Sequence, residues 1–420
     1  MLDRAIPPTF AKEFSFSLPQ PEIITLPNKC SIVWVRGLQQ QVCKIEVIMR
    51  AGKWYEPTPG LAHFTISMLE KGANGFTASE IAETLDMYGA QLELAAGPDF
   101  ASASIYSLNN KIHHVLPVFS ALLQTPTFAD DELSLMKDIF IENLKVNNEK
   151  TSYLASKHFK RNVFGGQHPY GSTLEIEAVN AIINIYSLQS FFAQQCQPFE
   201  VYVTGSLQPT QMKGIENLFN QFGQTNAQAV KPILQEASER HVQFKKEGSL
   251  QASLRIGGQT LTRNEPDYFW FLLLNHLFGG YFGSRLMKNI REEKGLTYGI
   301  YSSVSVHRHN ALFTIGTDVN IDKVTLTIGE IRKEIQRLHQ DNIPVREIEV
   351  ARNHFLGALQ LELSNPFAVT EKIKNIRLNN LPANYYQELI NATLSANGSD
   401  LNMIAQKYLN WGRFHQISVG

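Results

Sequence analysis

The chain has 420 residues, 43% of them hydrophobic and 18% charged, with a formal net charge of −1 at pH 7. This composition is that of a globular protein, and a length of this order predicts two or more domains. The near-neutral charge excludes a strong electrostatic attraction to nucleic acid or to anionic membranes. The cysteines Cys30, Cys43 and Cys196 are odd in number and show no CxxC spacing, which favours reduced thiols over a disulfide framework.

The first residues of the chain lack the apolar segment of about 7–15 residues that marks a secretory signal. No run of about 18 apolar residues occurs elsewhere, so we expect no membrane-spanning helix. We therefore expect a cytoplasmic protein, and a periplasmic location stays open if a leader has already been removed.

Two segments near the N-terminus predict strands. Residues 31–35 form a short apolar run, and residues 42–50 alternate between an apolar face and a charged face that carries Lys44, Glu46 and Arg50. This period of two predicts a strand that is buried on one side only.

Helical signals follow. Residues 60–71 predict a helix, and Thr77 with Glu80 forms a capping box that predicts the start of another. The stretch 91–107 predicts two strands divided by a Gly-Pro turn. Longer helices are predicted over 109–124 and 130–149.

The second half of the chain repeats the order of elements found in the first. The equivalent segments are 42–52 and 249–258, 60–72 and 268–280, and 130–146 and 345–363. The offset of roughly 205–215 residues indicates a duplicated domain of mixed α and β structure. We predict one domain over 1–228 and another over 229–420, with the joint inside the polar stretch 223–240.

The helix at 60–72, with the sequence GLAHFTISMLEKG, aligns with an inverted zinc-protease pattern, H-x-x-E-H. His63 occupies the first histidine position, Ile66 the glutamate position and Ser67 the second histidine position. A catalytic zinc needs three protein ligands and a water that a base can deprotonate, and His63 supplies one ligand only. A lone histidine on an amphipathic helix is more often an ordinary packing residue.

This segment resembles the corresponding helix of the pitrilysin (insulinase-like) zinc metallopeptidases, a family that includes the mitochondrial processing peptidases and two-lobed bacterial relatives. The resemblance extends over nearly the whole chain and includes GGQHPYGS at 165–172. It implies an α+β fold of two homologous domains, each a mostly antiparallel sheet packed by helices, together forming half of a clamshell. It also places the third zinc ligand of the family at Asn143, while the adjacent Glu142 is rotated by about 100° around the helix. No metal is therefore expected in this chain, and zinc is expected in a partner subunit.

The stretch 279–302 of the second half carries an arginine and a tyrosine seven residues apart, Arg291 and Tyr298. Taken alone, Arg291 is a solvated charge near a helix C-terminus and Tyr298 a surface aromatic at the start of a strand. The same segment resembles the family region that holds a substrate-binding Arg/Tyr pair. The resemblance implies that these side chains donate hydrogen bonds to the substrate backbone and to the developing oxyanion.

Together these features predict a non-catalytic, substrate-binding subunit of a heterodimeric zinc metallopeptidase that acts on peptides or small unfolded polypeptides. A homologous partner with an intact H-x-x-E-H would supply the zinc. The alternative is a stand-alone structural or peptide-binding homodimer without peptidase activity. His307 and His309 are predicted to share one strand face and could chelate a metal, but the sequence offers no third ligand.

Overall fold

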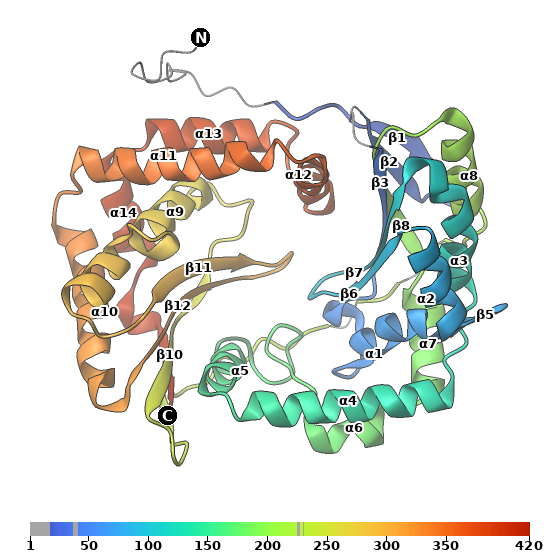
Figure 1. The fold of residues 1–420 in the computed structure, drawn as a ribbon. Coiled ribbons are helices and arrows are strands. Elements are labelled where there is room, and N and C mark those ends of the chain that lie inside the picture. Colours follow the sequence, from blue (N-terminus) through green and yellow to red (C-terminus); the bar gives the residue numbers. More distant parts are fainter. Residues whose placement is uncertain (1–16, 37–40, 225–226, 230) are drawn as a thin grey trace, which may run out of the picture.

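The computed structural model describes residues 17–36, 41–224, 227–229 and 231–420, which fold into two halves of mixed α and β structure (Figure 1). Each half is built on one main sheet in which most neighbouring strands are antiparallel. The predicted α+β class with two homologous domains is confirmed.

The sheet of the first half has the strand order β1-β2-β8-β3-β7-β6. Its neighbours are antiparallel except β2 and β8, which are parallel. The strands are β1 (Glu22–Thr25), β2 (Ser31–Val35), β3 (Val42–Met49), β6 (Gln91–Ala96), β7 (Ala101–Leu108) and β8 (Pro198–Thr204). The helices of this half are α1 (Leu61–Ser67), α2 (Ala78–Met87), α3 (Ile112–Gln124), α4 (Asp130–Asn148), α5 (Thr151–Phe164), α6 (Ile176–Ile182), α7 (Ile185–Gln195) and α8 (Pro209–Phe219).

The sheet of the second half has the order β11-β12-β10-β13-β9. Its strands are β9 (His241–Phe244), β10 (Gln251–Thr260), β11 (Ile300–Val306), β12 (Ala311–Asn320) and β13 (His415–Val419). Its α-helices are α9 (Tyr268–Asn275), α10 (Val324–Gln340), α11 (Val345–Glu362), α12 (Pro366–Leu378), α13 (Tyr385–Ser395) and α14 (Gly398–Tyr408), with π-helical turns η4 (His276–Gly280) and η5 (Met287–Glu293).

The two sheets share one topology. The order β2-β8-β3-β7-β6 of the first corresponds strand by strand to β9-β13-β10-β12-β11 of the second. The one parallel pair also falls at the same place, β2 with β8 and β9 with β13. This agreement is the three-dimensional counterpart of the repeat seen in the sequence.

The halves exchange a helix. After α4, helix α5 crosses to the second half and packs on β10 and β13, and after α11, helix α12 packs on β8 of the first half (Figure 1). Ala155 and Phe159 of α5 join Leu312 in one buried cluster, and Val369 of α12 joins Val33 in another. The domain boundary at 228/229 stays a prediction. Helix α5 of the first half packs on the second sheet, and helix α12 of the second half packs on the first sheet.

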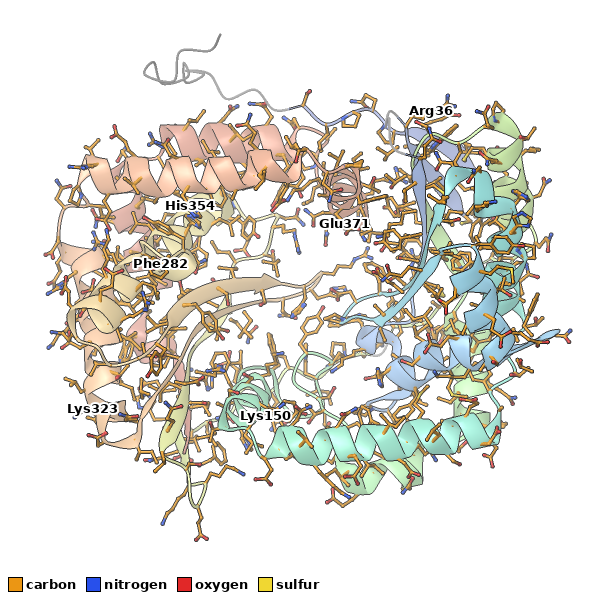
Figure 2. The ribbon with its side chains drawn as sticks, viewed as in Figure 1. Arg36, Lys150, Phe282, Lys323, His354 and Glu371 are labelled. Carbon is orange, nitrogen blue, oxygen red and sulfur yellow. The ribbon has the colours of Figure 1, made fainter. Side chains whose placement is uncertain are left out.

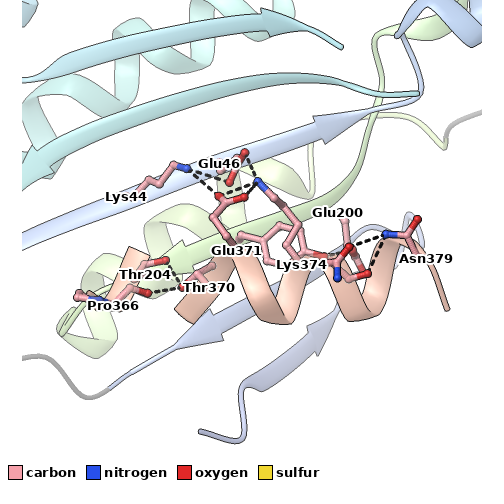
Figure 3. Close-up of polar contacts among 11 residues, drawn as sticks. Lys44, Glu46, Glu200, Thr204, Pro366, Thr370, Glu371, Lys374 and Asn379 are labelled. Atoms are coloured by element: carbon pink, nitrogen blue, oxygen red, sulfur yellow. Dashed lines mark hydrogen bonds and ion pairs between the residues drawn. The ribbon is translucent and has the colours of Figure 1, made fainter. Parts of the chain in front are cut away.

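The strand predicted over 42–50 is present as β3, and helix α12 explains why the expectation that only one of its faces is buried was wrong. Lys44 and Glu46 of β3 are buried as well as the apolar residues on the opposite face. Lys374 of α12 donates to Glu46 at 2.7 Å, and Lys44 donates to the other oxygen of Glu46 at 3.0 Å (Figure 3). Burial opposes ionisation of Glu46, but the ammonium groups of Lys374 and Lys44 outweigh burial and lower its pKa. The charged face of the strand is therefore the seam between the two halves.

The capping box of Thr77 and Glu80 is present at the start of α2. The helix predicted over 60–71 changes at Met68 into a 3-10 turn, η2 (Met68–Lys71). The last strand pair begins at Ile300, so the expectation that Tyr298 starts the strand was wrong. Within the described residues, no helix has the length and apolar character needed to cross a bilayer.

Candidate functional site

Helices α1 and α4 bring the predicted zinc-site positions of the first half together. The ring of His63 on α1 lies 5.3 Å from the ring of Phe140 on α4, measured between centroids. Asn143 follows Phe140 by almost one helical turn and thus lies on a neighbouring part of the same helix face. Helix α4 therefore meets α1 at Phe140, and Asn143 lies almost one turn further along α4.

The side chains at these positions do not fit a catalytic zinc ion. Ile66 is 1% exposed and belongs to the hydrophobic core, where it offers neither a ligand nor a base. Ser67 is half-buried and Asn143 is exposed. Glu142 is exposed and accepts a hydrogen bond from Lys145 at 2.6 Å. Across the described ranges of the chain, no three His, Cys, Asp or Glu side chains gather in a metal-binding group.

The electrostatic surroundings of α1 contain a group that sequence reasoning missed. Glu56 is buried, and its Oε2 accepts the backbone amides of Gly60 and Ala62, both at 3.0 Å. Burial raises the pKa of Glu56 to about 7, although these amides and Lys53 act in the opposite direction. Burial and then the nearby charge of Lys53 lower the pKa of His63. One feature of the sequence pointed to this group, which is that Glu56 is an acidic residue directly before a Pro-rich bend.

The Arg/Tyr pair of the second half is open to solvent. Tyr298 is 93% exposed in the turn before β11, and Arg291 is half-buried in η5. The guanidinium of Arg291 lies 4.6 Å from the ring centroid of Phe282, which is itself 63% exposed. Within the described part of the chain, Arg291 has no carboxylate partner. The pair is thus free to accept a ligand from outside the chain.

The chain does not combine these two sets of residues into one site. Phe282, against which Arg291 packs, lies in the second half, on the opposite side of the molecule from α1 (Figures 1 and 2). Among the described residues, no hydrogen bond or cation–π contact joins Arg291 to Tyr298, and the ring that Arg291 overlies is that of Phe282. The sequence pointed to the zinc-site positions and to the Arg/Tyr pair separately, and it could not show that they lie in different parts of the molecule.

The tips of two hairpins meet between the halves. The loop after β11 places the ring of His309 on Trp54, with 3.9 Å between centroids, and the ring of His307 on Tyr170 at 4.2 Å. Asp99, in the loop between β6 and β7, accepts the Tyr170 hydroxyl and the backbone amide of the residue after His307. The prediction that His307 and His309 share a strand face was wrong, because β11 ends at Val306.

Two family models match successive parts of the chain. Residues 32–175 match the family model described as insulinase (peptidase family M16), and residues 183–355 match the one described as peptidase M16 inactive domain. The chain is 24% identical over 310 residues to the uncharacterized zinc protease YmxG of Bacillus subtilis, covering 73% of this chain and 75% of that protein. It is 22% identical over 349 residues to the non-peptidase homolog YmxG of Helicobacter pylori, covering 82% and 80%.

Solved structures with a similar fold include the peptidase M16 inactive domain from Pseudomonas fluorescens. It superposes with a TM-score of 0.87 at 22% identity and covers 96% of this chain and 98% of that one. A protease from Helicobacter pylori superposes with a TM-score of 0.86 at 17% identity, covering 96% and 100%. At these identities the likeness establishes the fold.

Proposed function

Because this chain belongs to the M16 (insulinase) peptidase family and is a non-peptidase member of it, we propose that it is the substrate-binding subunit of a heterodimeric zinc metallopeptidase. A homologous partner with an intact H-x-x-E-H supplies the zinc, the attacking water and the base. The substrates are peptides or small unfolded polypeptides held between the two chains.

One observation carries this proposal. The chain has Ser67 and Asn143 at the positions of zinc ligands, while the half-buried Arg291 and the exposed Tyr298 have no ionic partner among the described residues. A charged donor and a phenolic donor whose side chains form no hydrogen bond with any described residue suit a ligand that is rich in acceptors. An extended peptide backbone presents such acceptors at regular spacing.

The chemistry assigned to the pair is electrostatic. When a zinc-bound water attacks a peptide carbonyl, negative charge develops on the carbonyl oxygen. A fixed guanidinium and phenol near that oxygen stabilise the charge, and removal of one such donor typically costs about 10²–10³ in rate. Phe282 restricts the guanidinium of Arg291 through a cation–π contact, so less order has to be imposed when substrate binds.

Exposed apolar residues on α4 and α11 support the proposal of a partner chain that, like this one, consists of two related halves. Leu135 and Val146 of α4 are exposed, as are Val350 and Leu361 of α11. Each residue of the second pair follows its counterpart by 215 positions, which is also the separation between the first residues of α4 and α11. Two pairs of exposed apolar residues at equivalent positions suit contact with a partner chain that also has two related halves.

The test is reconstitution. The purified chain is assayed on a fluorogenic peptide alone and together with a homologous H-x-x-E-H chain from the same genome. We expect activity in the mixture only, and we expect Arg291→Ala or Tyr298→Phe to reduce kcat/KM by about 10²–10³-fold. Arg332→Ala and Tyr186→Phe are matched controls at exposed positions and should leave the activity unchanged.

The competing function is a stand-alone structural or peptide-binding homodimer without peptidase activity. It predicts that no homologous H-x-x-E-H chain gains activity from this protein and that Arg291 is dispensable. A stable homodimer in sedimentation analysis, together with both of those results, would replace the subunit proposal.

A further inference from the structure

A small cationic pocket lies where the two halves meet. Its volume is about 220 Å³, and it is formed by α5, the turn at Lys53 and the loop after β11. Its polar lining includes Lys53, Lys157, Lys160, Tyr170 and His307. Lys53 belongs to the first half and His307 to the second, so a ligand in this pocket would contact both.

Two of the three lysines form no ion pair with any described residue. Lys157 donates to Glu175 at 2.6 Å, which neutralises it. Among residues 17–36, 41–224, 227–229 and 231–420, no carboxylate forms an ion pair with Lys53 or Lys160. Two ammonium groups that line one cavity without an anion leave a local charge of about +2, which would attract an anion from solution.

The groups that line the pocket together also interact electrostatically. Burial and then the charge of Lys53 lower the pKa of Lys160. The pKa of His307 is also lowered by burial, and Lys160 and Lys53 add to this effect while Asp99 opposes it. The positive charges of Lys53 and Lys160 therefore oppose each other and the protonation of His307 in the pocket that all three residues line.

The acidic groups that interact with the pocket residues already accept other hydrogen bonds. Lys53 acts electrostatically on Glu56, whose Oε2 accepts the backbone amides of Gly60 and Ala62. Asp99 accepts the Tyr170 hydroxyl and the backbone amide of Arg308 at 2.9 Å. Glu175 accepts from Lys157 and from Thr173 Oγ1 at 3.1 Å. Among the described residues, none of these carboxylates forms an ion pair with Lys53 or Lys160.

We propose that this pocket binds a small dianion of the phosphate type between Lys53 and Lys160. The volume is below the roughly 300 Å³ at which pockets begin to hold drug-sized ligands, so an ion or a terminal phosphate group fits and a peptide segment does not. Lysine binds phosphate as a compact point charge, and two lysines match two negative charges. The bound dianion removes the repulsion between Lys53 and Lys160 and thereby ties the turn at Lys53 to α5, the helix that packs on the sheet of the second half.

The binding of phosphate is measured by titration calorimetry and by the shift of Tm on the full chain. Sodium phosphate and glycerol 2-phosphate are compared with sodium chloride at equal ionic strength. We expect a saturable rise in Tm with phosphate and none with chloride, because a ligand that binds only the folded state stabilises it by mass action. If glycerol 2-phosphate also binds, the site accepts a terminal phosphate group, and if it does not, the site takes the free ion. Absence of a saturable effect from both phosphates overturns the proposal.

Variants assign the effect to the pocket. Lys53→Met and Lys160→Met should each weaken phosphate binding at least tenfold, and the control Lys213→Met, at an exposed lysine that pairs with Glu216, should not. Since each pocket substitution also removes a repulsion, the ligand-free variants should be no less stable than the natural chain. Unchanged binding in the Lys53/Lys160 double variant overturns the proposal. The result is independent of the proposed peptidase function, because no step of it requires a partner or a substrate.

Discussion

The backbone amide of Arg308 donates a hydrogen bond of 2.9 Å to Asp99 Oδ2, and the two residues are 209 positions apart. The same separation divides the first residues of β6 and β11, Gln91 and Ile300. Equivalent hairpins of the two halves therefore touch each other at their tips. The duplication brings its own two copies into contact at the centre of the molecule.

This contact predicts that Asp99 stabilises the junction. Asp99→Ala would leave the Tyr170 hydroxyl and the Arg308 amide without their acceptor in a partly buried place. Hydrogen bonds to a charged group contribute about 1.5–3 kcal/mol each, so we expect the free energy of unfolding to fall by about 3 kcal/mol. Urea denaturation followed by circular dichroism measures it, with Asp138→Ala on exposed α4 as the control. A loss no larger than that of the control would show that the hairpins do not hold the halves together.

The ion network between β3 and α12 gives a second prediction. Glu46→Ala removes the buried carboxylate that Lys44 and Lys374 share and leaves them only the more exposed Glu371 (Figure 3). Removing one partner of a buried ion pair costs about 3–5 kcal/mol, and because Glu371 still pairs with both lysines we expect a loss of about 3 kcal/mol in the free energy of unfolding. Lys213→Ala breaks an exposed pair and should cost at most about 1 kcal/mol. Similar losses in the two variants would contradict the role of the network as the seam.

Glu56 predicts a specific dependence of stability on pH. Its pKa is about 7 in the folded chain and near the ordinary 4.5 when unfolded. Between these values the unfolded chain releases the proton first, so the stability contributed by Glu56 is present below about pH 4.5 and is lost as the pH rises to about 7. The span corresponds to roughly 3 kcal/mol. Glu56→Gln should remove this slope from the plot of unfolding free energy against pH, whereas Glu177→Gln, at an exposed position, should keep it. An unchanged slope in Glu56→Gln would show that another group causes it.

The geometry of α1 and α4 predicts that a zinc site can be restored. Ser67→His places a second imidazole one turn after His63, and Asn143→Glu adds a carboxylate on the facing helix, which completes three protein ligands. We expect the double variant to retain about one equivalent of zinc through gel filtration, as measured by mass spectrometry of the metal. Adding His63→Ala to the same background should abolish retention. If the double variant retains no zinc, the two helices no longer have the ligand spacing of the family.

The sequence by itself determined the periodic features of this protein. Alternation in 42–50, the capping box at Thr77 and the repeat of elements follow from local backbone preference and side-chain spacing, which a single chain displays directly. The loss of the zinc set at Ile66, Ser67 and Asn143 was also readable there, because a ligand is defined by residue type and register. The resemblance then supplied the roles predicted for Arg291 and Tyr298.

Only the tertiary structure decided which charges are buried and which residues meet. Lys44 and Glu46 looked like a solvated face until α12, more than 300 residues further along the chain, covered them. Lys53, Lys160 and His307 share no sequence pattern, yet the helix exchange and the hairpin contact bring them to one pocket. Spacing along the chain governs contacts within one element, whereas contacts between elements depend on how the two halves pack, and packing is a property of the whole chain.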